Sequence, residues 1–255
     1  ARVRHQGAHG EEAGRDGDGP SDGWRLVRPL RGRRHAGVGA RSAAPVDRRA
    51  AAAGEARGRA PVTWSIIVRD PARNLFAIAV ATRFFAVGAL VPHASPVGAV
   101  ATQALVNPTY GPRGLRLLAE GVAPETAVAT LVGLDAGRET RQLHLMDREG
   151  RSARWTGRDC VDWCGHLAAP DVSLAGNMLA GPEVLDATLA TWLARADLPL
   201  VPRLLAAMRA GEAAGGDKRG KQSAAILVQG AEPFPRLSIR VDDHAEPLDE
   251  LERLG

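Results

Sequence analysis

The feature that most constrains the fold of this chain is a set of strand patterns that occur in neighbouring pairs. The pairs are predicted at 63–69 with 75–82, 142–147 with 152–156, and 223–229 with 236–241. Residues 70–74 join the first pair, and their Asp, Pro and Asn suit a turn. Because strands joined by short turns pair antiparallel, these patterns predict mostly antiparallel sheets. A further strand is predicted over 97–105.

Helical patterns lie between these strands, each with a proline near its start and an apolar stripe behind it. The prolines are Pro112, Pro124, Pro182, and Pro199 or Pro202. Strand pairs with helices grouped between them indicate an α+β layered sandwich, in which helices cover mostly antiparallel sheet. A Rossmann arrangement is disfavoured.

Composition divides the chain near residue 62. Residues 1–62 carry 13 Arg against 7 acidic residues, and residues 63–255 carry 20 basic against 22 acidic residues. The formal charge of +4 is therefore the sum of +6 and −2. The Arg/Gly/Ala-rich segment 1–62 has too few aliphatic residues to offset the entropy of ordering, so we predict that it is disordered. Residues 63–255 are predicted to form a single domain with its own core.

Three interpretations of residues 1–62 remain open: a basic interaction arm, a targeting segment, or translated upstream DNA. Targeting is the weakest, because no apolar stretch precedes a small-residue cleavage site. We favour the third interpretation, in which Val62 marks the start codon and Thr63 is the true second residue. In that case the positive charge of residues 1–62 does not belong to the natural protein and does not indicate a nucleic-acid partner. We therefore expect no nucleic-acid partner.

Several other classes of protein are disfavoured. No apolar run approaches the length of a membrane-spanning helix, so no membrane partner is expected. Only two cysteines occur, which fits a reducing cytoplasm. Cys160-x-x-x-Cys164-x-His166 has no second ligand cluster to complete a zinc site, so we expect no metal and no cofactor.

Lysine is rare in this chain, and both lysines lie in one segment, residues 215–223, here called the glycine loop. Lysine can change its pKa on burial, whereas arginine is a fixed charge, so this loop is a candidate for chemistry. The plainer alternative is a pair of solvated charges that survived codon bias. The loop nearly matches a phosphate-binding loop, but Gln222 replaces the required Ser or Thr, and the predicted helix precedes the loop rather than following it.

Thr63 would become a nucleophile if nothing preceded it, because its own α-amine would then act as the base. The amine has a pKa of about 8, against about 10.4 for lysine, so it is the better base at neutral pH. Lys218 would serve as a charged neighbour that keeps the amine neutral and stabilises developing negative charge. The alternative is that Thr63 is simply a β-branched residue in a strand.

Asn107 and Asn177 each place an amide beside glycine or proline near the end of a predicted element. Such an amide can donate a hydrogen bond to an oxyanion. The commoner role is to cap a helix or to occupy a turn.

These segments together resemble the domain of unknown function 1028 family, which is grouped with the N-terminal-nucleophile (Ntn) hydrolases. The resemblance covers 63–241, and its carriers are 63–66, 79–84, 101–104 with 107–111, 176–179, and 215–220 with 222–223. Family members begin Met-Thr, which coincides with Val62-Thr63. The resemblance implies a four-layer αββα sandwich with two facing antiparallel sheets. It also implies hydrolysis of an amide-like bond, by analogy of fold.

We therefore expect an Ntn amidohydrolase that acts on a small amide or peptide, with Thr63 as nucleophile and base. The other expected site residues are Lys218 and Asp217 for electrostatic tuning, Asn107 or Asn177 as oxyanion donors, and Arg83, Arg219, Gln222 and Ser223 for substrate binding. The alternative is a non-catalytic ligand-binding or scaffold protein with the same fold. Either is compatible with a homo-oligomer.

Overall fold

The structure is a computed structural model that describes residues 63–161 and 163–255. The predicted disorder of residues 1–62 lies outside the described residues. Described strands form two separate antiparallel sheets, with the strand orders β10-β9-β2-β1-β8-β7 and β3-β4-β5-β6.

The first sheet is built around β1. Its strands are β1 (Thr63–Asp70), β2 (Leu75–Thr82), β7 (Trp163–Ala169), β8 (Val172–Leu179), β9 (Ser223–Gln229) and β10 (Pro235–Val241). β1 pairs with β2 on one side and with β8 on the other, so Thr63 lies opposite both Thr82 and Asn177. Thr63, the first residue that the structure describes, thus lies in the interior of a sheet rather than at its edge.

The second sheet is smaller. Its strands are β3 (Pro92–Ser95), β4 (Gly98–Ala104), β5 (Arg141–Asp147) and β6 (Ser152–Thr156). β5 lies between β4 and β6, and Gln103 of β4 is opposite Gln142 of β5. This pairing places two side-chain amides next to each other on the same face of the sheet.

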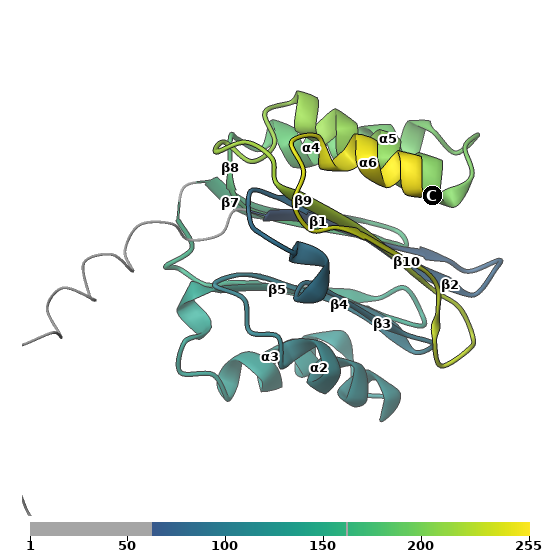
Figure 1. Ribbon diagram of the computed structural model, residues 1–255. Helices are drawn as coiled ribbons and strands as arrows, with labels where there is room; N and C mark the ends of the chain where they lie inside the picture. The colour runs from purple at the N-terminus through teal and green to yellow at the C-terminus, as the bar shows by residue number, and fades with distance from the viewer. Residues whose placement is uncertain (1–62, 162) are drawn as a thin grey trace, which may run out of the picture. The chain divides into compact units, whose positions relative to one another are not determined.

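Helices cover the outer face of each sheet (Figure 1). They are α2 (Tyr110–Ala119), α3 (Pro124–Gly133), α4 (Glu183–Ala194), α5 (Leu200–Ala213) and α6 (Pro247–Leu254), with two short 3-10 helices, η1 (Val87–Ala89) and η2 (Arg138–Thr140). In Figure 1, α4, α5 and α6 lie over the first sheet, and α2 and α3 lie beneath the second. The predicted α+β sandwich with two antiparallel sheets is confirmed. No described helix has both the length and the apolar character needed to cross a membrane.

Alternation along β1 divides its side chains between two layers. Trp64, Ile66 and Val68 belong to the apolar cluster that packs against α4 and α5. Ile67 belongs to the apolar layer between the two sheets. Thr63 and Ser65 share the face of Ile67, so the inter-sheet layer changes from apolar to polar toward the start of β1.

The packing of the first sheet on its helices predicts a large effect of truncation there. Leu174→Ala removes a side chain that is 0% exposed, and should lower the free energy of unfolding by about 2–5 kcal/mol in urea denaturation. Leu134→Ala is the matched control, because Leu134 is 75% exposed and should change stability by less than about 0.5 kcal/mol. Equal losses in the two variants would contradict this core.

Candidate functional site

Thr63 lies buried where the two sheets meet at the start of β1. Its hydroxyl donates a hydrogen bond to the Thr82 hydroxyl over 3.2 Å. Its carbonyl oxygen faces Nδ2 of Asn177 at 3.3 Å and Nε2 of Gln103 at 3.4 Å. Thr63 therefore has hydrogen-bond partners in both neighbouring strands and in the facing sheet. It is almost completely buried, with 2% of its surface exposed.

A chain of buried amides connects the sheets beside Thr63. Oε1 of Gln142 accepts from Nε2 of Gln103 at 2.7 Å and from Nδ2 of Asn177 at 3.0 Å. Nε2 of Gln142 donates to the Gly176 carbonyl at 2.8 Å. Since the Thr63 carbonyl and Oε1 of Gln142 only accept, the amide nitrogen of Asn177 must face them, which fixes the orientation of this side chain.

Asn177 is left with an unused acceptor. Within the described part of the chain, its Oδ1 is buried and has no hydrogen-bond partner. Asn177 also lines a cavity of about 40 Å³ with Ala104, Met178 and Cys160. Ala104 and Met178 have φ of 66° and 53°, a left-handed conformation that costs a non-glycine residue of order 1–3 kcal/mol. Strained backbone and an unsatisfied buried acceptor thus coincide beside Thr63.

The glycine loop is fastened to the same end of the first sheet. The carboxylate of Asp217 accepts from the backbone N–H of Arg83 at 2.6 Å and from that of Arg219 at 2.9 Å. The backbone N–H of Gln222 donates to the carbonyl of Thr82 at 2.9 Å. Because Thr82 is the register partner of Thr63, these bonds bring the loop next to the start of β1.

Several predicted site residues meet around this loop. The guanidinium of Arg219 is 3.1 Å from the Asp217 carboxylate, and Nη1 of Arg83 donates to the Arg219 carbonyl at 2.7 Å. Lys218 follows Asp217 directly and is exposed. The fold therefore places Thr63, Asn177 and the loop that carries Lys218 at one end of the sheet.

Gln222 and Ser223 make structural contacts with their side chains. Nε2 of Gln222 lies 3.3 Å from the carboxylate of Asp243. Oγ of Ser223 donates to the carbonyl of Phe84 and accepts from the N–H of Val87 at 3.1 Å. These contacts fasten the segment that follows β2, and they leave the predicted substrate-binding role of both residues without support.

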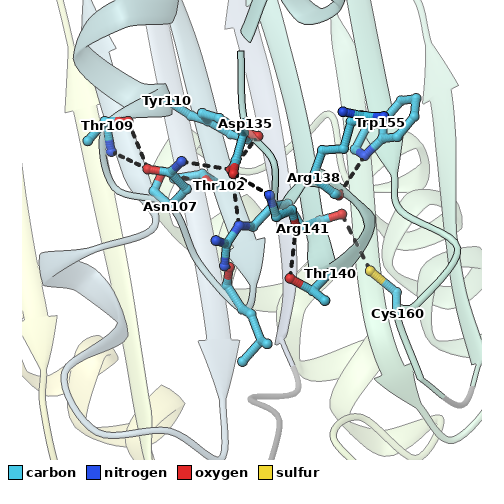
Figure 2. Close-up of polar contacts among 12 residues, drawn as sticks. Thr102, Asn107, Thr109, Tyr110, Asp135, Arg138, Thr140, Arg141, Trp155 and Cys160 are labelled. Atoms are coloured by element: carbon cyan, nitrogen blue, oxygen red, sulfur yellow. Dashed lines mark hydrogen bonds and ion pairs between the residues drawn. The ribbon is translucent and has the colours of Figure 1, made fainter. Parts of the chain in front are cut away.

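Asn107 lies in a different polar cluster, shown in Figure 2. Its Oδ1 accepts from the backbone N–H of Thr109 at 3.1 Å and from the Thr109 hydroxyl at 2.8 Å, and its Nδ2 donates to Asp135 at 2.9 Å. Burial would raise the pKa of Asp135, but hydrogen bonds from Asn107 and other donors hold it well below its usual range. Asn107 thus has the turn role that the sequence also allowed, in the segment just before α2.

The second lysine of the loop has a structural role. Nζ of Lys221 is 3.0 Å from the carboxylate of Glu212 near the end of α5, and it also pairs with Glu246, just before α6. The hydrogen bond to Glu246 raises the pKa of Lys221, opposing partial desolvation. The ammonium of Lys221 therefore links α5 to the segment before α6 through ion pairs. In a phosphate-binding loop, the lysine would bind a phosphate instead.

A second buried network was not predicted. Oγ of Ser65 is 2.7 Å from Oε1 of Gln103 and 2.9 Å from Nε2 of His144, and Nδ1 of His144 is 2.9 Å from Oγ of Ser173. The Ser65 hydroxyl donates its hydrogen bond to Oε1 of Gln103, so toward His144 it can only accept. Nε2 of His144 must therefore be protonated and act as the donor. Burial lowers the pKa of His144 to about 3, so its ring is neutral. The only sequence signal was polar residues at alternate positions of β1.

The described side chains of the cysteine segment have protein partners rather than one another. The Cys160 thiol donates to the carbonyl of Arg141 at 3.4 Å, as Figure 2 also shows, and burial raises its pKa to about 11. His166 lies beside the Thr156 hydroxyl at 3.2 Å. Over residues 63–161 and 163–255, no group of three or more His, Cys, Asp or Glu side chains is placed to bind a metal.

Comparison with known proteins places this chain in one family. The sequence pattern of the family of unknown function DUF1028 matches residues 63–251. The chain belongs to the DUF1028 family. A crystal structure of a Silicibacter pomeroyi protein, also described as DUF1028, is similar to the DUF1028 chain at 35% identity and a TM-score of 0.71. The match covers 76% of this chain and 87% of that one. Comparison with curated proteins gave no match.

The neutral, buried His144 predicts a pH dependence of stability. Its folded pKa of about 3 lies below the ordinary value of 6.5, so below pH 6.5 the unfolded chain binds a proton that the folded chain does not. This contribution to stability is lost as the pH falls from 6.5 toward 3, with a slope approaching about 1.4 kcal/mol per pH unit. Urea denaturation of the DUF1028 chain over this range measures it.

The matched variants are His144→Asn and His244→Asn, since His244 is exposed. The first should be less stable at neutral pH but should lose less stability on acidification than the wild type does. The second should follow the wild-type pH profile. A His144→Asn profile parallel to that of the wild type would contradict a neutral buried ring.

Proposed function

We propose that this DUF1028 protein is an Ntn amidohydrolase that cleaves a small amide or peptide, with Thr63 as nucleophile once residues 1–62 are absent. The observation that supports it most is the position of Thr63. A buried hydroxyl lies on the first residue of a central strand, where both sheets and the glycine loop converge. We also propose a cytoplasmic location, which the two free thiols of Cys160 and Cys164 favour.

The proposed reaction needs only the hydroxyl and the amine of one residue. The neutral α-amine takes the proton of the Thr63 hydroxyl while Oγ1 attacks the substrate carbonyl carbon. The amine then returns this proton to the leaving nitrogen as the C–N bond breaks, which leaves an ester on Oγ1. Water, deprotonated by the same amine, hydrolyses the ester and restores the hydroxyl. A free terminus is therefore essential, because an amide nitrogen at position 63 is not basic.

The contacts of the Thr63 carbonyl supply the orientation that this reaction requires. The amides of Asn177 and Gln103 bind the carbonyl, and the Thr82 hydroxyl accepts a hydrogen bond from the Thr63 hydroxyl. Because hydrogen bonds hold both the carbonyl and the hydroxyl of Thr63, its backbone and side-chain torsions are restricted. Such preorganisation lowers the entropic cost of reaching the reactive geometry.

The glycine loop supplies charge in this proposal. The ammonium of Lys218 lowers the pKa of the α-amine by repulsion and stabilises negative charge in the transition state. Asp217 acts as a positioning residue, because its carboxylate is already bound by the backbone of Arg83 and by Arg219. The guanidinium groups of Arg83 and Arg219 remain our candidates for a substrate carboxylate.

The two asparagines have different parts in the proposal. Both amide hydrogens of Asn177 face protein acceptors, so in this geometry Asn177 offers an acceptor, and a donor role would require its amide to turn. We assign its unpartnered Oδ1 to an N–H of the amide substrate. Asn107 is not assigned to the site, because its side chain binds Asp135 and Thr109.

A chain that begins at Thr63 should hydrolyse members of an acyl and aminoacyl anilide panel, read as release of the aniline. The full 255-residue chain should not. Thr63→Ala in the shortened chain should lower kcat/KM by at least about 100-fold, because it removes the nucleophile, whereas Thr63→Ser should retain part of the activity. A shortened chain with one extra residue before Thr63 is the matched control, since it keeps the hydroxyl but blocks the amine.

A covalent probe makes the test independent of the substrate. An amide-directed electrophile should label Thr63, as located by mass spectrometry of the digested protein. Activity that persists in Thr63→Ala, or in the chain with the extra residue, would refute the assignment. A natural protein that keeps residues 1–62 and still binds small ligands would favour the non-catalytic ligand-binding alternative.

A further inference from the structure

A cavity of about 620 Å³ lies at the opposite end of the first sheet from Thr63. It is lined by the end of β1, the turn to β2, the segment between α4 and α5, and the start of α5. β1 is eight residues long, so its two ends are about 23 Å apart. The volume is typical of small-molecule sites, and the distance separates the cavity from the proposed reaction site.

The ionisable side chains of this cavity are Arg69, Arg73, Arg203, Asp70 and Asp197. Both carboxylates already have an arginine partner. Nη1 of Arg73 is 2.7 Å from Asp70, and Asp197 accepts two hydrogen bonds, at 3.1 and 3.2 Å, from Arg195, which lies outside the lining.

Arg203 differs from the other two arginines of the cavity. Arg69 pairs with Asp171 at 2.7 Å and Arg73 pairs with Asp70, but among the described residues Arg203 has no carboxylate within salt-bridge distance. Asp197 attracts Arg203 from beyond salt-bridge distance, but its hydrogen bonds go to Arg195. Because the lining has three guanidinium groups and two carboxylates, a net positive charge remains at Arg203.

The guanidinium of Arg203 is also fixed in orientation. It stacks on the ring of Trp192, 3.8 Å from the ring centroid, and its Nε donates to the Trp192 carbonyl at 2.7 Å. Trp192 is buried and lines the same cavity. With Nε engaged, the two terminal nitrogens present a planar pair of donors, which matches the two oxygens of a carboxylate or a phosphate.

We propose that this cavity binds a small molecule through a carboxylate or phosphate group, with Arg203 as the principal partner. Arg69 and Arg73 add positive potential at the wall, and the first turn of α5, which carries no acidic side chain, contributes in the same direction. Trp192 keeps the Arg203 fork in place, so little side-chain entropy is lost when an anion binds.

The test uses the full chain and three probes at matched low ionic strength: inorganic phosphate, succinate and chloride. Binding is followed by calorimetry and by NMR of the Arg203 Nε–H and Trp192 indole N–H signals. We expect saturable binding of phosphate or succinate, with the stronger of the two identifying the anion class, and no saturable binding of chloride. Failure of both phosphate and succinate to saturate would overturn the proposal.

Variants assign the binding to Arg203. Arg203→Gln should weaken it by at least about tenfold, whereas Arg113→Gln, which removes an equal charge from the exposed face of α2, should leave it unchanged. Circular dichroism and the melting temperature check the fold of each variant. Binding that survives in folded Arg203→Gln would refute the site.

Two variants that introduce opposite charges at one position keep the proposal testable if Arg203→Gln does not fold. Ala196 is exposed and lies in the turn that lines the cavity. Its side chain is only a methyl group, so its replacement removes little packing. Ala196→Glu should weaken anion binding and Ala196→Lys should strengthen it, each by roughly two- to fivefold. Identical affinities in the two variants would place the anion elsewhere and reject the cavity as its site.

Discussion

The bridging of two sheets by buried side-chain amides is the interaction on which the site depends most. Gln142 receives hydrogen bonds from Gln103 of its own sheet and from Asn177 of the facing sheet, and returns one to the Gly176 carbonyl. A buried amide without partners costs about 1–3 kcal/mol, so sliding one sheet against the other by a residue would break several such bonds at once. The amides therefore set how the sheets are aligned, and with that the surroundings of Thr63.

The same layer is apolar farther along β1, and the contrast has a physical reason. Ile67, Ile78 and Val80 pack between the sheets without directional bonds, so they stabilise the sandwich without fixing its register. Toward Thr63 the contacts become directional and buried, with Ser65 and His144 between the two regions. A rigid polar end on an apolar support is the arrangement that positions a reactive group well.

Much of the fold followed from local sequence patterns. The strand pairs at 63–82, 142–156 and 223–241 were predicted because each has a short turn and regular alternation. β8, which lies between β1 and the edge strand β7, was missed because Gly176 and Asn177 are residues that strands disfavour. β7 also contains a glycine, and β3 has only four residues, so their patterns were too weak to predict. α6 was missed although Pro247 near its start and Asp249 and Glu250 in its first turn are signals of a helix start. Tertiary pairing, which the local pattern does not encode, decides these elements.

The site was less predictable, because its chemistry depends on which atoms face one another. Asn107 and Asn177 looked equivalent in sequence. In the structure, the amide nitrogen of Asn107 donates to Asp135, and that of Asn177 donates to Gln142. The two lysines also lie in different surroundings. Lys221 pairs with glutamates beside α5 and α6, and Lys218 lies exposed in a turn that Asp217 ties to β2. The rarity of lysine drew attention to the loop, and only the contacts in the folded chain show that Lys221 has a structural role.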